Sequence, residues 1–183
     1  MNDQLSRNTW GILACPQCGD SLQKTPEGAA CQHCHTKYDY TNSGSLDLRL
    51  KKSKKCKLEF ELETALLPEQ GFAFKPLTAK PEPEVDFSGT TLPYHLSKEL
   101  LSYFPKAKNK NSLMLDLGCG YSIHRQVSEH AGFEYVGLDY KAPGAPILGD
   151  GHSLPFKDNS FEFILSIAVL EHIRFPFVMI REA

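Results

Sequence analysis

Residues 112–122 read Ser-Leu-Met-Leu-Asp-Leu-Gly-Cys-Gly-Tyr-Ser, and this stretch decides the predicted fold. Apolar residues surround Asp116 and stop at Gly118 and Gly120, the pattern of a buried parallel strand that leads into a glycine turn and then a helix. Glycines in such a turn let a ligand approach the backbone closely, and in open α/β sheets ligands bind beyond the carboxyl ends of the strands. We therefore predict an α/β fold with a ligand site at this turn.

The charge around the turn indicates which ligand it binds. A dinucleotide-binding turn has the pattern Gly-x-Gly-x-x-Gly, but residue 123 is Ile, and Asp116 just before the first glycine would repel a phosphate. A second strand is predicted at 133–138 and ends at Asp139, about 20 residues beyond Gly118, the spacing at which an acid binds a ribose diol. Two acids favour a ligand with a ribose and positive charge, such as S-adenosylmethionine, over the dinucleotide of an oxidoreductase.

Four sequence blocks then occur in order: Leu-Asp-Leu-Gly-Cys-Gly at 115–120, Val-Gly-Leu-Asp at 136–139, the stretch at 149–164, and Val-Leu-Glu-His at 169–172. Over residues 112–183 they resemble class I S-adenosylmethionine-dependent methyltransferases of the type 11-like group, although Ser122 stands where many members have a third glycine. The resemblance implies a Rossmann-like sheet that is incomplete, with strand order 3-2-1-4. We expect this chain to be a fragment, or another chain to supply the missing strands.

The resemblance also implies the cofactor-binding residues. Besides the glycine turn and the acid of the second strand, they come from the loop after the third strand and from the end of the fourth. Catalytic residues stay unassigned, because methyl transfer needs mainly an in-line approach, and positioning can supply much of the rate. The implied cofactor-binding residues are Asp116, Gly118, Cys119, Gly120, Asp139, Tyr140, Asp150, Gly151, His152 and Ser166.

The remaining elements of this half follow from hydrophobic spacing. We predict a helix at 94–104 that covers one face of the sheet, a helix at 123–130 and a short strand at 145–148. A fourth strand is predicted at 161–167, and its continuous apolar run predicts burial on both faces.

The amino-terminal segment contains two Cys-x-x-Cys pairs, Cys15 with Cys18 and Cys31 with Cys34. This arrangement is typical of a structural zinc site, in which four thiolates close a tetrahedral shell. His33 and His35 are less favoured alternative ligands. Short ribbon strands are predicted at 12–14, near Leu22 and at 37–40, with a further one at 46–50. The module resembles zinc ribbons that precede some bacterial methyltransferases, including RNA-modifying ones, where the ribbon helps to hold the RNA; a packing role is the alternative.

We predict a zinc ribbon at 1–50, a connector at 51–93 and the N-terminal part of a class I methyltransferase domain at 94–183. Lysines crowd the start of the connector, and its prolines exclude a helix or a central strand, while Phe72, Phe74 and Phe87 are expected to pack on the larger domain. The lysine run reads as a solvated linker or, less favoured, as a phosphate-binding patch.

Composition constrains the function. A net charge of −2 with 41% hydrophobic residues lacks the basic excess of a dedicated nucleic-acid binder. No run approaches the roughly 18 apolar residues of a membrane helix, and the polar N-terminus is no signal peptide, so we expect a cytoplasmic protein with reduced cysteines. The predicted function is methyl transfer from S-adenosylmethionine to RNA or a small molecule; the alternative is a non-catalytic zinc-ribbon adaptor that binds a partner.

Overall fold

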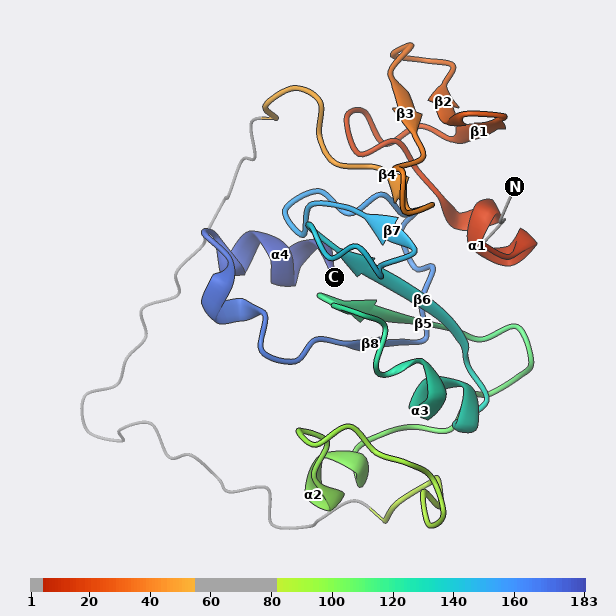
Figure 1. Ribbon diagram of the computed structural model, residues 1–183, viewed down its shortest axis with the longest axis vertical. Helices are drawn as coiled ribbons and strands as arrows, with labels where there is room; N and C mark the ends of the chain where they lie inside the picture. Colours follow the sequence, from red (N-terminus) through yellow and green to blue (C-terminus); the bar gives the residue numbers. More distant parts are fainter. Residues whose placement is uncertain (1–4, 55–81) are drawn as a thin grey trace, which may run out of the picture.

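The computed structural model describes residues 5–54 and 82–183, which form two sheets (Figure 1). A small antiparallel sheet has the order β1-β2-β3, with β1 at Leu22–Thr25, β2 at Gly28–Cys31 and β3 at Lys37–Asp39. A five-stranded sheet has the order β4-β7-β6-β5-β8, and its neighbouring strands are all parallel. The protein is therefore an α/β structure preceded by a small β module, as predicted.

The larger sheet is built around β5 (Leu113–Leu117), whose five residues are all buried. On one side it pairs with β6 (Glu134–Asp139), which is followed by β7 (Ile147–Leu148), and on the other with β8 (Phe163–Leu165). In sequence order this arrangement is 3-2-1-4, which confirms the predicted topology. The strand positions agree with the prediction, although β7 and β8 are shorter than expected and β6 begins one residue later.

One face of the sheet is covered by the segment before β5 and by the helix that follows the glycine turn. Helix α2 (Lys98–Leu101) and helix α3 (Arg125–His130) lie below the sheet in Figure 1. They are shorter than the predicted 94–104 and 123–130 helices, but they cover the face as expected. The core on this side consists of Phe87, Leu96, Leu101, Phe104, Met114, Val127, Ala131 and Phe133.

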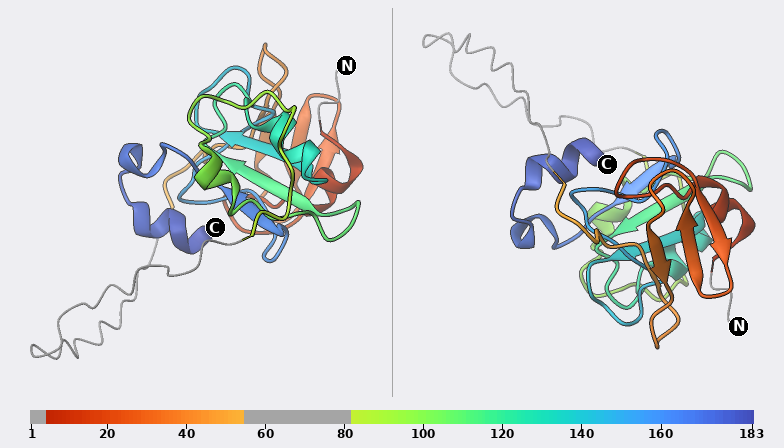
Figure 2. Two further views of the ribbon diagram at one scale, coloured as in Figure 1. Left: turned by 90° about the horizontal axis from the view of Figure 1, so that it is seen from below. Right: turned by 90° about the horizontal axis from the view of Figure 1, so that it is seen from above.

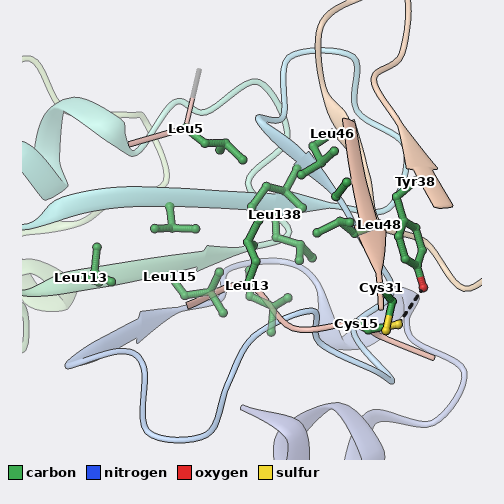
Figure 3. Packing of buried hydrophobic residues seen from close by; sticks show 14 of the residues in the cluster. Leu5, Leu13, Cys15, Cys31, Tyr38, Leu46, Leu48, Leu113, Leu115 and Leu138 are labelled. Atoms are coloured by element: carbon green, nitrogen blue, oxygen red, sulfur yellow. Dashed lines mark hydrogen bonds between the residues drawn. The ribbon is translucent and has the colours of Figure 1, made fainter. Parts of the chain in front are cut away.

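The opposite face is covered by the amino-terminal module (Figures 1 and 2). Leu115, Leu138 and Ile147 of the large sheet belong to the same buried cluster as Leu13 and Tyr38 of the module, and Figure 3 shows part of this shared core. Helix α1 (Arg7–Ile12) joins the two parts at another point. The side chains of Ser6, Asn8 and Thr9 at its start all donate hydrogen bonds to the Glu134 carboxylate at the start of β6.

Two strand predictions for the module are wrong. Ile12 ends helix α1 instead of starting a strand, because Ser6 caps that helix, while Leu13 and Ala14 make isolated bridges. The alternating leucines at 46–50 do not extend the ribbon. Strand β4 (Leu46–Asp47) instead pairs with β7 and becomes the edge of the large parallel sheet, where Leu46 and Leu48 are fully buried. The predicted domain limits at residues 50 and 93 stay predictions.

The fourth strand packs on both faces, Ile164 against one core cluster and Phe163 and Leu165 against the other, but it is less buried than predicted. All three residues of β8 are half-buried, because this strand lies at the edge of the sheet. The chain continues through a 3-10 turn, η1 (Leu170–His172), and helix α4 (Pro176–Glu182). Leu170, Phe175, Phe177 and Ile180 are exposed there.

The connector is described at residues 51–54 and from residue 82 onwards. Phe87 is buried and contacts Phe104 edge-on with ring centroids 5.6 Å apart, which confirms that it packs on the large domain. Phe72, Phe74 and the distal lysines Lys55 and Lys57 lie outside the described residues. In the two described segments, no helix combines the length and apolar character needed to cross a bilayer.

Candidate cofactor pocket and metal site

The glycine turn after β5 is fixed against the end of β6. The backbone N–H groups of Gly118 and Cys119 both donate to the carbonyl of Leu138, over 2.8 and 3.0 Å. Gly118 and Gly120 have φ angles of +82° and +54°, a region that favours glycine. Ser122 also has a positive φ, +59°, so it adopts the glycine conformation expected at its position. The turn therefore forms despite the missing third glycine.

Asp139 closes this turn from the second strand. Its Oδ2 accepts a 3.1 Å hydrogen bond from the N–H of Gly120, and its Oδ1 accepts bonds of 2.9 Å from the N–H groups of Lys141 and Ala142. A carboxylate has about four lone-pair sites, so one acceptor site remains on Oδ2. The turn amides that would hold a pyrophosphate in a dinucleotide-binding protein are instead occupied by protein acceptors.

A pocket of about 1180 Å³ opens at the carboxyl ends of the strands. Strands β5, β6 and β7 each contribute the residues at or just after their ends, as expected for a parallel sheet. Helix α4 closes one side through Val178 and Met179. Of the residues implied by the family resemblance, the pocket is lined by Gly118, Asp139, Tyr140, Asp150, Gly151 and His152.

Asp150 and His152 form a linked pair in this pocket. Oδ1 of Asp150 accepts 2.9 Å and 2.7 Å bonds from the backbone N–H and from Nδ1 of His152. Among the described residues, none donates to Oδ2 of Asp150, which leaves this oxygen available to a ligand. Nε2 of His152 in turn accepts a 3.2 Å bond from the backbone N–H of Phe175, so the imidazole supports the wall of the pocket.

Asp116 takes part in a buried network instead of lining the pocket. The residue is 1% exposed, its carboxylate lies 3.0 Å from Nδ1 of His124, and it accepts a 2.7 Å bond from the Tyr135 hydroxyl. Nε2 of His124 lies 2.6 Å from Nε2 of His95. The expectation that two acids would meet the ligand therefore needs correction: Asp139 reaches the pocket, whereas Asp116 supports the turn from below, because polar side chains surround it.

Comparison with known proteins finds a match for the carboxyl-terminal part of the chain. Residues 115–183 match the sequence model of the methyltransferase domain family. This part of the chain is similar to a methyltransferase domain. Two curated relatives are similar over stretches of comparable length. A methyltransferase-named protein of Encephalitozoon cuniculi is 39% identical over 69 residues, which are 35% of this chain and 33% of that protein. An uncharacterized protein of Methanocaldococcus jannaschii is 31% identical over 85 residues, 43% of this chain and 38% of that protein.

The chain thus spans little more than a third of the length of these curated relatives. The match begins within β5 and covers the glycine turn, β6 and β7, whose carboxyl ends contribute to the pocket, as well as β8 and α4. The matched part of the chain therefore has its pocket where parallel α/β sheets bind ligands.

Besides Asp116, three other implied residues do not line the pocket. Cys119 is buried behind the turn, and this burial, together with the negative charge of Asp116, raises the pKa of its thiol to about 12. Gly120 contributes its N–H to Asp139 instead of a pocket surface. Ser166 is exposed outside the pocket, because β8 ends at Leu165 and the chain turns through Ala168, with φ +54°, before it reaches the site.

Sequence reasoning missed several residues that line the pocket. Ala168 and Val169 take the place predicted for Ser166, and the apolar character of the Val169 block was the available signal. Leu50, Ser53 and Lys54 come from the segment that follows β4, and no local pattern places them beside strands a hundred residues away. The remaining missed lining residues are Leu117, Leu138, Lys141, Gly149, His172, Ile173, Arg174, Phe175, Val178 and Met179.

The four predicted metal ligands are brought together in the amino-terminal module. The sulfur atoms of Cys15, Cys18, Cys31 and Cys34 all lie within 4.8 Å of one another. The Cys15–Cys34 and Cys18–Cys31 Sγ pairs are 3.5 Å apart. Tetrahedral zinc with Zn–S bonds of about 2.3 Å separates its sulfurs by about 3.8 Å, so the donor set fits a zinc ion.

The surroundings of the cluster agree with a structural metal site. The hydroxyl of buried Tyr38 lies 3.3 Å from Sγ of Cys15 (Figure 3) and can donate a hydrogen bond to a thiolate, the outer-shell contact that orients a metal ligand. Only cysteines make up the candidate metal cluster in the described part of the chain. His33 and His35 are exposed and outside it. Four sulfurs leave no open position for water, which favours a structural role.

Proposed function

We propose that this protein is an S-adenosylmethionine-dependent methyltransferase with a structural zinc ion in its amino-terminal module. The observation that best supports the cofactor assignment is the hydrogen bonding of the glycine turn. The N–H of Gly120 donates to Asp139, and two further N–H groups of the turn donate to the carbonyl of Leu138. These contacts give the turn a carboxylate surface in place of free N–H groups. Such a surface suits a cationic nucleoside and disfavours a pyrophosphate.

In this proposal the two pocket acids bind the adenosine. The remaining acceptor site on Oδ2 of Asp139 takes a ribose hydroxyl, and Oδ2 of Asp150 takes the adenine amino group. Tyr140, which is exposed in the pocket, offers its ring to the adenine. The bound cofactor supplies a sulfonium methyl group, which an acceptor nucleophile takes in line while the electron pair of the broken bond stays on sulfur. The chain's contribution is to hold donor and acceptor in that geometry.

The methyl acceptor is an RNA or a small molecule in this proposal, and the setting is the cytoplasm. A ligand pocket usually has a volume of about 300 to 1,000 Å³. The volume of about 1180 Å³ therefore leaves space for part of an acceptor beside the cofactor. The acidic net charge is compatible with both acceptor classes.

Calorimetry with S-adenosylhomocysteine tests the cofactor assignment directly. We expect the zinc-loaded chain to bind S-adenosylhomocysteine and not NAD. Asp139→Asn should weaken binding by about tenfold or more, because hydrogen bonds to a charged group contribute about 1.5 to 3 kcal/mol. Asp158→Asn is the matched control, since Asp158 is exposed and outside the pocket. Binding of NAD in place of S-adenosylhomocysteine, or equal affinities for both variants, would refute the assignment.

A partner-binding adaptor is the second candidate function. The exposed apolar side chains Leu170, Phe175, Phe177 and Ile180 over η1 and α4 favour it, together with the half-buried edge strand β8. Radiolabelled methyl transfer into fractionated cell extract separates the two functions, with RNase treatment as the control for RNA. Any transferred label excludes a purely non-catalytic adaptor, and label that resists RNase excludes an RNA acceptor.

A further inference from the structure

The first Cys-x-x-Cys turn contacts the cofactor pocket through a backbone carbonyl. The Ser153 hydroxyl donates a 2.8 Å hydrogen bond to the carbonyl of Pro16, which lies between Cys15 and Cys18 in the chain. Ser153 is 1% exposed and follows directly on the pocket residues Gly149 to His152. A buried hydroxyl satisfied in this way is costly to disconnect. The metal turn, which is this first Cys-x-x-Cys turn at residues 15–18, therefore fixes the end of the loop at 149–153 that lines the pocket.

Lys54 strengthens the same junction. Its Nζ donates to the Ser153 hydroxyl over 3.0 Å and to the Pro16 carbonyl over 3.4 Å, and the residue also lines the pocket. Among the described residues, no carboxylate forms an ion pair with it. Four thiolates around a zinc dication carry a net charge of about −2, which attracts an ammonium group beside the metal turn. Metal loading therefore favours the observed position of Lys54.

The residues on either side of the metal turn and of Ser153 are also paired. The N–H of Ala14 donates to the carbonyl of Pro155 over 2.9 Å, and the N–H of Lys157 donates to the carbonyl of Ile12 over the same distance. Leu13 makes an antiparallel bridge with Phe156. The loop at 153–157 is thus held by the backbone that leads into Cys15, so a displaced cysteine turn would move the loop with it.

We propose that the four-cysteine metal site positions the wall of the cofactor pocket, with Ser153 and Lys54 as positioning residues, so that metal occupancy and ligand binding are coupled. Metal binding fixes the Pro16 carbonyl, the carbonyl fixes Ser153 and Lys54, and these hold the loop at 149–153. Because coupling between two binding sites is reciprocal, a bound ligand also tightens metal binding. The inference rests on the proposed function only in the choice of S-adenosylhomocysteine as the probe.

The test compares two serine variants of the zinc-loaded full chain. Ser153→Ala removes the bond to the metal turn, whereas Ser160→Ala removes a 2.6 Å bond from the same loop to Lys157, away from the metal turn. Hydrogen exchange of residues 149–157 is the first readout, zinc content the second and S-adenosylhomocysteine affinity the third. We expect Ser153→Ala to retain its zinc, to exchange faster at 149–157 and to bind the probe about tenfold more weakly. Ser160→Ala should match the wild type in exchange at 149–153 and in affinity.

A lysine pair gives an independent test that leaves Ser153 in place. Lys54→Met should weaken probe binding in the zinc-loaded chain, while Lys52→Met, at an exposed position outside the pocket, should not. Unchanged exchange at 149–157 in Ser153→Ala would overturn the proposal, whether or not the probe binds. If exchange rises as expected but the wild type fails to bind S-adenosylhomocysteine, the positioning role stands and the cofactor assignment fails.

Discussion

Nδ1 of His124 lies 3.0 Å from Oδ2 of Asp116, and both residues are almost completely buried beneath the glycine turn. The same carboxylate oxygen accepts the 2.7 Å bond from Tyr135. Asp116 thus has two polar partners beneath the turn, His124 and Tyr135, and does not line the pocket. The acid of the glycine motif therefore stabilises the structure that positions the ligand site.

This relationship predicts that Asp116→Ala is strongly destabilising. The change leaves the imidazole of His124 and the hydroxyl of Tyr135 buried without their acceptor, which costs about 3 kcal/mol or more in free energy of unfolding. Asp116→Asn keeps one acceptor oxygen and should cost less. Urea denaturation measures both values, and Asp158→Ala, at an exposed loop position, should stay within about 0.5 kcal/mol of the wild type. An equal stability of Asp116→Ala and Asp158→Ala would contradict the network.

The contact between His95 and His124 predicts a pH dependence of stability. Desolvation lowers the pKa of His95 below its ordinary value of 6.5, and the charge of His124 lowers it further, against the opposite effect of Asp116. The unfolded chain therefore binds this proton more readily than the native chain, so stability falls as the pH drops below about 6.5. The urea midpoint should be lower at pH 5.5 than at pH 7.5, and the difference should shrink in His95→Gln. His172→Gln, at an exposed position, should keep the wild-type difference.

Gly118 and Gly120 are needed in the turn for different reasons. A Cβ at Gly118 would overlap the side chain of Val169, and the φ of +82° is also unfavourable for alanine. At Gly120 the space is open, and only the φ of +54° disfavours alanine. We expect Gly118→Ala to lose both stability and S-adenosylhomocysteine binding, whereas Gly120→Ala should cost about 1 kcal/mol of stability. Thermal unfolding measures the stability of the two variants, and calorimetry measures their binding of S-adenosylhomocysteine. A larger loss of stability or binding in Gly120→Ala than in Gly118→Ala would contradict this prediction.

Elemental analysis should find one zinc ion per chain. Cys34→Ala removes a ligand, so this variant should lose zinc and be less stable, since metal binding contributes to the folding free energy of such a module. Cys119→Ser is the matched cysteine control, because Cys119 lies in the glycine turn and outside the cluster. Full zinc content in Cys34→Ala would show that the four sulfurs do not form the site.

The thiol of Cys119 should resist alkylation in the native protein. Its pKa is raised to about 12 by burial and by the nearby Asp116, so almost no thiolate exists at pH 8. Iodoacetamide at pH 8 should leave Cys119 unmodified in the native chain and modify it in urea, as peptide mass spectrometry can measure. Rapid native labelling of Cys119 would indicate that the turn opens readily.

The sequence predicted the parts of the fold whose causes are local. The glycine turn, the four strands that carry the sequence blocks and the four-cysteine cluster follow from short motifs, whereas the strand order is what the family resemblance implies. The position of Leu46 could not be predicted, because its alternating pattern fits a ribbon strand as well as the edge of a distant sheet. Asp116 was assigned to the ligand because sequence shows its charge and not the neighbours His124 and Tyr135. Lys54 joins the pocket through contacts with Pro16 and Ser153, which no local pattern encodes.

Strand β4 belongs by sequence to the ribbon, but it pairs with β7 in the large parallel sheet, so the two modules share this strand. A gene rearrangement that transferred the ribbon up to residue 50 to another protein would carry this strand away and leave β7 paired only with β6, with its other side exposed as a sheet edge. The ribbon is thus not an interchangeable appendage. Transplantation, in evolution or in protein engineering, would have to move both parts together or design a replacement for this edge.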